Sequence, residues 1–385
     1  MIVFNQTGKG TYWRAYHFAR ILAARHHSVT LVSTSKYARH GVTHQEIDGI
    51  HLLETPDVFT GSLRSGYDPW NVINRLFQLR NERFHIVHAF ESRPVVIYPA
   101  LKARKRGAVM VLDWADWFGR GGSVEERKNP IIRSSLRIVE TYYEDHFRRH
   151  ASGTTVINKF LKERAISLGV KPESILLLRN GSDTRSAVIE RIEARNLAGI
   201  RDDGPLIGFV GGTYSSDAQL MAQAFNRVLK RYPTARLVLA GYFNRDIESE
   251  LANPGAIIRT GPITSQQVHM YLSACDLCWL PLSASGANLG RWPFKLNDYM
   301  TAGRATISTD IGDLKEVVPL YKLGVVTQPD PVSFAARSLE LLGSPAEANL
   351  LGNTARAAAE QYFDWEIITK DLEDFYLRLV SNQPQ

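Results

Sequence analysis

The sequence predicts an α/β protein built from two doubly wound parallel sheets. Short β-branched runs alternate with helical segments along the whole chain, which is typical of βα units. A glycine turn follows the first strand of each half, first at Gly8 and Gly10 and again at Gly211 and Gly212. The charged stretch Asp183 to Pro205 separates the two series and reads as a linker. At 385 residues the chain is long enough for two domains.

Each half is expected to contain six strands, and the division predicts domains over 1–184 and 185–365. Ligands of such sheets bind at the carboxyl ends of the strands, so we expect these ends to face each other across a cleft. The expected strands of the first half are Ile2–Asn5, Ser28–Ser33, Ile86–Ala89, Val109–Trp114, Thr154–Ile157 and Ile175–Leu178. Those of the second half are Leu206–Val210, Ala235–Ala240, Ala256–Thr260, Leu277–Leu282, Ala305–Thr309 and Gly324–Thr327.

The positive charge is concentrated in the first half. Residues 1–183 hold 27 Lys and Arg against 17 Asp and Glu, a balance of +10, within a net charge of +7. An anionic acceptor or an acidic membrane surface fits this excess, and a solvated face without a partner fits it equally well. We expect no nucleic-acid partner, because no nucleic-acid-binding module accompanies the charge.

The two cysteines, Cys275 and Cys278, lie at the entry of an apolar strand. A single Cys-x-x-Cys has no second ligand pair to complete a zinc site, so we expect buried thiols and no metal. Unpaired thiols indicate a reducing compartment, the cytoplasm, and the membrane interpretation of the basic half predicts a peripheral position at the inner face of the membrane.

The most informative helix runs from Pro293 to Gly303. Proline suits the first turn of a helix, glycine ends one, and Leu296, Tyr299 and Met300 form an apolar stripe at i, i+3 and i+4.

The other face of this helix carries Arg291, Lys295 and Asp298. Cations beside a helix start form an anion site, and a nearby carboxylate accepts hydroxyl donors, which together suit the diphosphate and ribose of a sugar nucleotide. An ordinary surface pair between Lys295 and Asp298 is the alternative.

The segment Lys295-Leu-Asn-Asp-Tyr-Met-Thr-Ala-Gly303-Arg resembles the donor-binding helix of GT-B glycosyltransferases, particularly the retaining family 4. Further stretches resemble landmarks of the same family: Leu177-Leu-Arg-Asn180-Gly-Ser-Asp183, Arg236-Leu-Val-Leu-Ala-Gly241, Leu272-Ser-Ala-Cys-Asp-Leu-Cys-Trp-Leu-Pro281 and Gln361-Tyr-Phe-Asp-Trp365. The resemblance implies a GT-B fold whose C-terminal helix, 366–385, crosses back to the first domain. It also implies transfer of a sugar from a nucleotide-sugar donor to a glycan or lipid-linked acceptor, with retention and without a metal or other cofactor.

The resemblance further implies that Lys295 contacts the diphosphate and that Asp298 binds the ribose. Fixed cations and N–H groups stabilise the charge on the departing diphosphate. The remaining expected donor-binding residues are Gly211, Gly212, Thr213, Arg291, Gly312 and Glu316. For Glu316 a capping box with Asp313 is the competing interpretation.

Three positions depart from the family pattern. Gly290 occupies a position where the family usually has an acidic residue, and Ala115 occupies a position where it often has a histidine. The family also commonly has two basic residues after the glycine turn, and Gly212 occupies one of these two positions. These departures predict that Arg291 and Lys295 are the cations that bind the phosphates. They keep two alternatives open: a GT-B module that binds a glycan or protein without transfer, and a sugar-nucleotide epimerase.

On the acceptor side we expect Asp116 to be the catalytic residue, because it ends a strand among aromatic residues that suit a sugar. Asp113 is the competing choice. The loop from Gly119 to Lys128 has glycines and charge typical of a mobile lid. The other expected acceptor-side residues are Gly10, Trp13, His88, Glu91 and Trp117.

Overall fold

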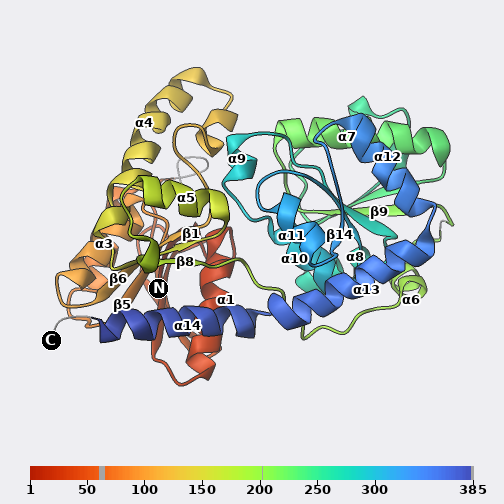
Figure 1. Ribbon diagram of the computed structural model, residues 1–385. Coiled ribbons are helices and arrows are strands. Elements are labelled where there is room, and N and C mark those ends of the chain that lie inside the picture. Colours follow the sequence, from red (N-terminus) through yellow and green to blue (C-terminus); the bar gives the residue numbers. More distant parts are fainter. Residues whose placement is uncertain (60–65, 202, 383–385) are drawn as a thin grey trace. The chain divides into compact units, whose positions relative to one another are not determined.

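The computed structural model describes residues 1–59, 66–201 and 203–382, and the chain forms two compact units (Figure 1). The first unit comprises Met1–Asn180, Gly290–Trp292 and Trp365–Gln385, and the second comprises Gly181–Leu289 and Pro293–Asp364. Within the described part of the chain, no helix is both long and apolar enough to cross a bilayer.

The sheet of the first unit has the strand order β3-β4-β2-β1-β5-β6-β7-β8. All neighbouring strands run parallel except β3 and β4, which form an antiparallel hairpin. The strands are β1 Ile2–Gln6, β2 Val29–Thr34, β3 Thr43–Ile47, β4 Ile50–Thr55, β5 Ile86–Phe90, β6 Val109–Trp114, β7 Gly153–Val156 and β8 Ile175–Leu177.

The hairpin β3–β4 was missing from the expected strands. Its turn places Asp48 and Gly49 at φ values of 50° and 74°, the left-handed conformations that a two-residue hairpin turn needs. An Asp-Gly pair between short strands is the sequence signal that predicts such a turn.

The helices of the first unit connect successive strands, and the C-terminal helix α14 packs against α1. The stacked rings of His17 and Trp365, 4.6 Å apart, join these two helices. The last helix therefore belongs to the first unit, as the family resemblance implied. The helices are α1 Thr11–Ala24, α2 Pro69–Gln78, α3 Pro94–Arg104, α4 Pro130–His146, α5 Lys159–Ser167 and α14 Trp365–Ser381.

The second unit has a fully parallel sheet with the order β11-β10-β9-β12-β13-β14. Its strands are β9 Leu206–Val210, β10 Arg236–Ala240, β11 Ile257–Gly261, β12 Leu277–Leu280, β13 Thr306–Thr309 and β14 Gly324–Thr327. Its helices are α6 Arg191–Leu197, α7 Ser215–Arg231, α8 Ser265–Ser273, α9 Gly286–Leu289, α10 Phe294–Thr301, α11 Leu314–Leu320, α12 Pro331–Leu342 and α13 Pro345–Tyr362.

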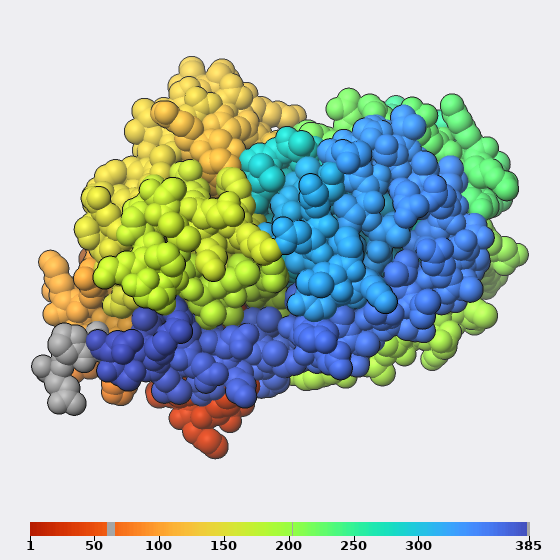
Figure 2. All heavy atoms as spheres, in the orientation of Figure 1, coloured from red at the N-terminus to blue at the C-terminus, as the bar shows by residue number. Residues whose placement is uncertain are grey.

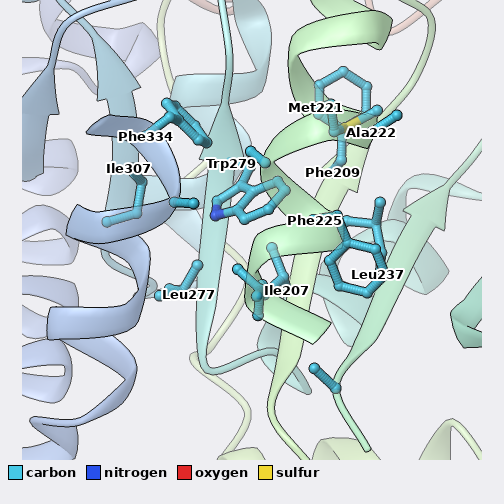
Figure 3. Packing of buried hydrophobic residues seen from close by; sticks show 14 of the residues in the cluster. Ile207, Phe209, Met221, Ala222, Phe225, Leu237, Leu277, Trp279, Ile307 and Phe334 are labelled. Atoms are coloured by element: carbon cyan, nitrogen blue, oxygen red, sulfur yellow. The ribbon is translucent and has the colours of Figure 1, made fainter. Parts of the chain in front are cut away.

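The core of the second unit is built around Trp279 on β12 (Figure 3). Its ring meets Phe225 of α7 and Phe334 of α12 edge-on, with ring centroids 6.1 and 5.2 Å apart. Helices α7 and α12, which pack against each other, thus bury the same side of the central strand β12.

Two segments differ from what the sequence predicted: one expected linker is part of a folded unit, and one short segment lies in the other unit. The expected linker, 183–205, belongs to the second unit, where α6 buries Ala194 and pairs Arg191 and Arg195 with Asp276. Conversely, Gly290–Trp292 belongs to the first unit although its chain neighbours belong to the second.

Strand order reverses once in each sheet, between β1 and β5 and between β9 and β12. Ligands of doubly wound sheets bind where the order reverses, beyond the carboxyl ends of the strands. The segments that follow β9 and β12, and those that follow β1, β5 and β6, are therefore where a site is expected.

Candidate functional site

A glycine turn follows β9 at the reversal point of the second sheet. Gly211 has φ of 68°, a conformation that favours glycine, and its N–H donates to the Ala240 carbonyl at 2.8 Å. Thr213 N–H donates to Asn244 Oδ1 at 2.9 Å. Hydrogen bonds to the neighbouring strand β10 and to the loop that follows it therefore fix the glycine turn.

Asp217, in the first turn of α7, connects the turn after β9 to the loop after β12. Its Oδ2 accepts from Thr213 Oγ1 at 3.1 Å. Its Oδ1 accepts from the Ser283 N–H at 2.8 Å and from Asn288 Nδ2 at 2.8 Å. The side chain is fully buried, so it positions the turn after β9 and the loop after β12. The sequence analysis missed this role, although an acid in the first turn of a helix after a glycine turn was its signal.

The helix α10 brings Lys295 to the glycine turn. Leu296, Tyr299 and Met300 are completely buried, as the apolar stripe predicted, which directs the opposite face outward. Lys295 Nζ donates to the Gly212 carbonyl at 2.8 Å and lies 4.9 Å from the centre of the Phe209 ring. A Cβ on Gly211 would lie 3.6 Å from the same ammonium, which is an ordinary contact, so the positive φ rather than lack of space favours glycine here.

Asp298 lines a cavity of about 530 Å³ together with Val210, Ser265, His269 and Thr301. Burial raises the pKa of Asp298 from 3.8 to about 7, while the charge of Lys295 opposes the rise. A half-buried carboxyl one helical turn from a lysine, at the mouth of a cavity, suits the recognition of a polyhydroxylated ligand.

Gly312 and Glu316 lie around the start of α11 in the second unit. Gly312 has φ of 58°, and Glu316 is exposed in the first turn of the helix. The Asp313 side chain caps no N–H of this helix, so the capping box that competed for Glu316 is not formed. Asp313 itself has helical φ and ψ, whereas a capping residue needs an extended backbone. Its backbone carbonyl accepts from the Glu316 N–H at 3.1 Å instead.

Asp116 follows β6 in the first unit. Burial raises its pKa from 3.8 to about 6; the charge of Arg291 opposes this rise and that of Asp113 adds to it. The competing Asp113 is fully buried, and Arg14 binds both of its carboxylate oxygens at 2.9 and 3.0 Å. Asp113 is therefore a structural anchor, and Asp116 is the acid with a pKa suited to proton exchange near neutral pH.

Glu91 and His88, expected on the acceptor side, are both buried. Glu91 Oε1 accepts from the Ala115 N–H at 2.9 Å, so this carboxylate holds the backbone next to Asp116. His88 lies between the Tyr376 hydroxyl, at 2.6 Å, and Thr155 Oγ1, at 3.1 Å. Burial lowers the pKa of His88 to about 3, so it is a neutral residue that connects β5 to α14. Contact of His88 with an acceptor would require these partners to move away.

Gly10 and Trp13 shape the start of α1. Gly10 precedes the helix with φ of 55°, and a Cβ there would lie 2.6 Å from Asn5 Nδ2. Trp13 is 44% exposed, and its Nε1 donates to the Gly8 carbonyl at 2.9 Å. The exposed ring is thus held in one orientation above the glycine loop.

Arg291, expected in the donor-binding domain, lies in the first unit instead. Its carbonyl accepts from Asn158 Nδ2 at 3.2 Å, and the carbonyl of the preceding Gly290 accepts from the Trp117 N–H at 3.1 Å. These bonds fix the segment, and the guanidinium charge influences Asp116. A role for Arg291 together with Lys295 stays a prediction.

The loop expected to be a glycine-hinged lid is folded around Trp117. A Cβ on Gly122 would lie 2.2 Å from the Trp117 carbonyl oxygen, and Ser123 N–H donates to that oxygen at 2.7 Å. Glu144 of α4 accepts from the N–H groups of Phe118 and Gly119 at 2.8 and 2.7 Å. These glycines allow close packing around Trp117 in the folded loop, and movement of the loop as a lid stays a prediction.

Both thiols are free and fully buried, as expected, and they lie against Gly208 of β9. Burial raises the pKa of Cys275 to about 12 and that of Cys278 well above its usual value. Neither is a reactive thiolate at neutral pH.

Comparison with known proteins gives a family match in each unit. Residues 9–181 match the model of the glycosyl transferase 4-like domain, and residues 204–344 match that of the glycosyl transferases group 1. The chain is also similar to TuaH of Bacillus subtilis, named for a role as a glycosyltransferase in teichuronic acid biosynthesis, with 24% identity over 263 residues. That match covers 66% of this chain and 62% of the relative's length.

Solved structures share the same fold. Sucrose-phosphate synthase from Thermosynechococcus elongatus has a TM-score of 0.75 and 15% identity, over 98% of this chain and 96% of that one. HepE of Anabaena in complex with UDP and glucose has a TM-score of 0.69 and 14% identity, over 98% and 99% of the two chains. With one glycosyltransferase model matched in each of its two α/β units, this chain belongs to the GT-B glycosyltransferases of the group 1, or family 4, type.

Proposed function

We propose that this chain transfers a sugar from a nucleoside diphosphate sugar to a glycan or lipid-linked acceptor, with retention and without a metal ion. The observation that carries the proposal is the position of the Lys295 ammonium, 2.8 Å from the Gly212 carbonyl at the reversal point of the second sheet. Family membership supports the same activity.

The chemistry follows from the charge of the leaving group. When the glycosidic bond breaks, the nucleoside diphosphate gains negative charge, and a fixed ammonium beside the glycine turn stabilises it. Lys295 supplies the ammonium, and Gly211 and Gly212 allow a phosphate to approach the backbone. Asp298, at the adjoining cavity, is the residue that we assign to the ribose hydroxyls.

We further propose UDP as the nucleotide to test first, because HepE of Anabaena binds UDP-glucose in its crystal structure. The assignment of Asp116 to the acceptor hydroxyl rests on its pKa of about 6, which leaves it ionised at neutral pH. Analysis of the product by NMR tests the stereochemistry: the anomeric configuration of the donor is retained under this proposal. An inverted product would overturn it and make Asp116 the general base of a direct displacement.

Calorimetry with UDP, GDP and ADP tests the donor site. Lys295→Ala is expected to weaken binding of the preferred nucleotide at least about tenfold, because a charge-assisted contact with phosphate is lost. Lys230→Ala, an exposed lysine at the far end of α7, is the matched control and should bind normally. Equal affinity of both variants would refute the proposed donor site.

Incubation with nucleotide sugars alone separates the remaining alternatives. Slow hydrolysis of the donor supports a transferase, whereas interconversion of the free sugar nucleotide would indicate an epimerase. If no nucleotide binds, the chain is a binding module without transfer activity.

We also propose that the protein works peripherally at an anionic membrane surface. The excess of 27 basic over 17 acidic residues in 1–183 supports this location.

A further inference from the structure

The helix α4 exposes a row of large apolar side chains. Ile131, Ile138 and Tyr142 are 77, 68 and 51% exposed, and Ile132 and Val139 beside them are 49 and 37% exposed. Spacings of seven and four residues place Ile131, Ile138 and Tyr142 on one face, and Ile132 and Val139 continue the same face. We call these five residues the α4 face.

The opposite side of α4 is charged and faces the first unit. Glu140 forms a buried ion pair with Arg93 at 2.8 Å, and Arg137 pairs with Glu125. The buried Glu144 accepts from Trp114 Nε1 at 2.8 Å as well as from the loop after β6.

This arrangement inverts the usual pattern of a surface helix, which buries its apolar side and exposes its charges. The inward charges bind Arg93, Trp114 and the loop after β6, so the helix cannot rotate without breaking those bonds. Contiguous exposed apolar side chains mark a surface that a partner covers. Figure 1 shows α4, in gold and yellow, extending away from the sheet of the first unit, and Figure 2 shows atoms of the same colours on the surface of the molecule.

The charges around the α4 face indicate which kind of partner binds to it. Lys128, just before the helix, Arg149, just after it, and Arg120 in the preceding loop are all exposed. The acids of the helix itself are engaged elsewhere: Glu140 and Glu144 are buried, and Asp145 pairs with Arg164 at 3.0 Å. Apolar side chains framed by cations match a bilayer of acidic lipids, whereas a second copy of the same face would bring like charges together.

We propose that the α4 face is the surface by which this protein docks on an anionic membrane, with Ile131, Ile138 and Tyr142 in the acyl–headgroup boundary. This inference deepens the proposed peripheral location. Its test does not depend on sugar transfer, because vesicle binding is measured without donor or acceptor.

Co-sedimentation with vesicles tests the surface. The full chain is expected to bind vesicles that contain phosphatidylglycerol, to bind pure phosphatidylcholine vesicles much more weakly, and to be released in part by 0.5 M salt. Ile131→Ser with Ile138→Ser should lower the partition coefficient at least about tenfold, since two apolar side chains lose their burial. Lys128→Ala with Arg149→Ala should abolish the preference for anionic lipid.

Ile192→Ser with Leu350→Ser is the matched control, because these residues are 70 and 66% exposed in the second unit. This control should bind vesicles like the unchanged protein, and both serine pairs should keep its melting temperature. Equal vesicle binding by the α4 variant and the control, or no binding to either vesicle, would overturn the proposal. A dimer that the α4 substitutions dissociate, seen by light scattering, would assign the face to a second copy instead.

Discussion

Gly290 lies so close to Trp117 that a Cβ on Gly290 would stand 2.3 Å from the Trp117 Cβ. The Trp117 N–H also donates to the Gly290 carbonyl at 3.1 Å. The position at which the family resemblance expects an acid therefore has no space for any side chain. The absence of the acid is part of the packing around Trp117, and any contact with a donor sugar must come from other residues.

Gly290→Ala should consequently destabilise the first unit. We expect a loss of about 1–3 kcal/mol in the free energy of unfolding, because the added methyl group overlaps the Cβ of Trp117. Urea unfolding followed by tryptophan fluorescence measures it, with Gly41→Ala as the control, since a Cβ on Gly41 meets nothing within 4 Å. Trp117→Gly combined with Gly290→Ala should cost less than the sum of the two single changes, because Trp117→Gly removes the Cβ that the new methyl group overlaps. Additive losses would show that the contact is unimportant.

Asp116 should control the acid limb of the pH profile. Burial raises its pKa to about 6, so the ionised form predominates above pH 6 and is lost below it. We expect kcat/KM to fall tenfold per pH unit below pH 6, and Asp116→Asn to lower kcat about 10²–10⁴-fold and to remove this limb. Glu173→Gln, an exposed acid of the same unit, should leave the profile unchanged. A limb that persists in Asp116→Asn would assign it to another group.

The regular part of both sheets was predictable because each central strand is a short apolar run between a helix and a turn. The expected run Val109–Trp114 is β6 with the same bounds. The strand β3 of the hairpin carried no apolar signal, because Thr43–Ile47 is mostly exposed and polar, whereas the apolar residues of β4 were overlooked. The helix that carries Lys295 was found because Leu296, Tyr299 and Met300 mark its buried side.

Packing against distant segments was beyond the reach of the sequence. Nothing local to Gly290 shows that Trp117, more than 170 positions away, fills its side-chain space. The burial of His88 likewise depends on Tyr376 of α14, a contact between residues 288 positions apart. Asp217 was passed over because its partners, Ser283 and Asn288, follow a strand that meets β9 only in the folded sheet.

The carboxyl of Asp298, which lies beside the cavity, should lower the stability of the folded protein when it is ionised. Its pKa is raised from 3.8 to about 7, so the folded state binds a proton that the unfolded state releases, and stability falls as the pH rises from about 4 to 7. At pH 8, Asp298→Asn should therefore stabilise the protein by roughly 1–3 kcal/mol, after allowance for the partial exposure of the carboxyl. At pH 4 both proteins should be equally stable.

The same substitution should weaken nucleotide binding about tenfold, because an amide is a poorer acceptor for ribose hydroxyls than a carboxylate. Thermal melts across pH and calorimetry with UDP measure the two effects. Asp246→Asn, an exposed acid of the same unit, should change neither quantity. Unchanged stability at pH 8 would contradict the raised pKa, whereas unchanged affinity would remove Asp298 from the donor site.

Asp217 should affect donor binding although it is completely buried. Its carboxylate accepts hydrogen bonds from Thr213, Ser283 and Asn288, which lie on both sides of the point where the strand order reverses. Asp217→Ala leaves these donors without their acceptor, and we expect a loss of about 2–4 kcal/mol in the free energy of unfolding. Nucleotide affinity should fall even at temperatures where the variant is fully folded, because the glycine turn loses its link to the loop after β12.

The matched control is Asp330→Asn, where the carboxylate accepts from Val332 N and Ser333 N at the start of α12. An asparagine caps a helix as well as an aspartate does, so this change should leave both stability and binding almost unaffected. If Asp217→Ala lowers stability but binds nucleotide normally, the loop after β12 takes no part in the donor site. A loss of affinity with native circular dichroism would instead show that the buried carboxylate orders the site through Thr213 and Ser283.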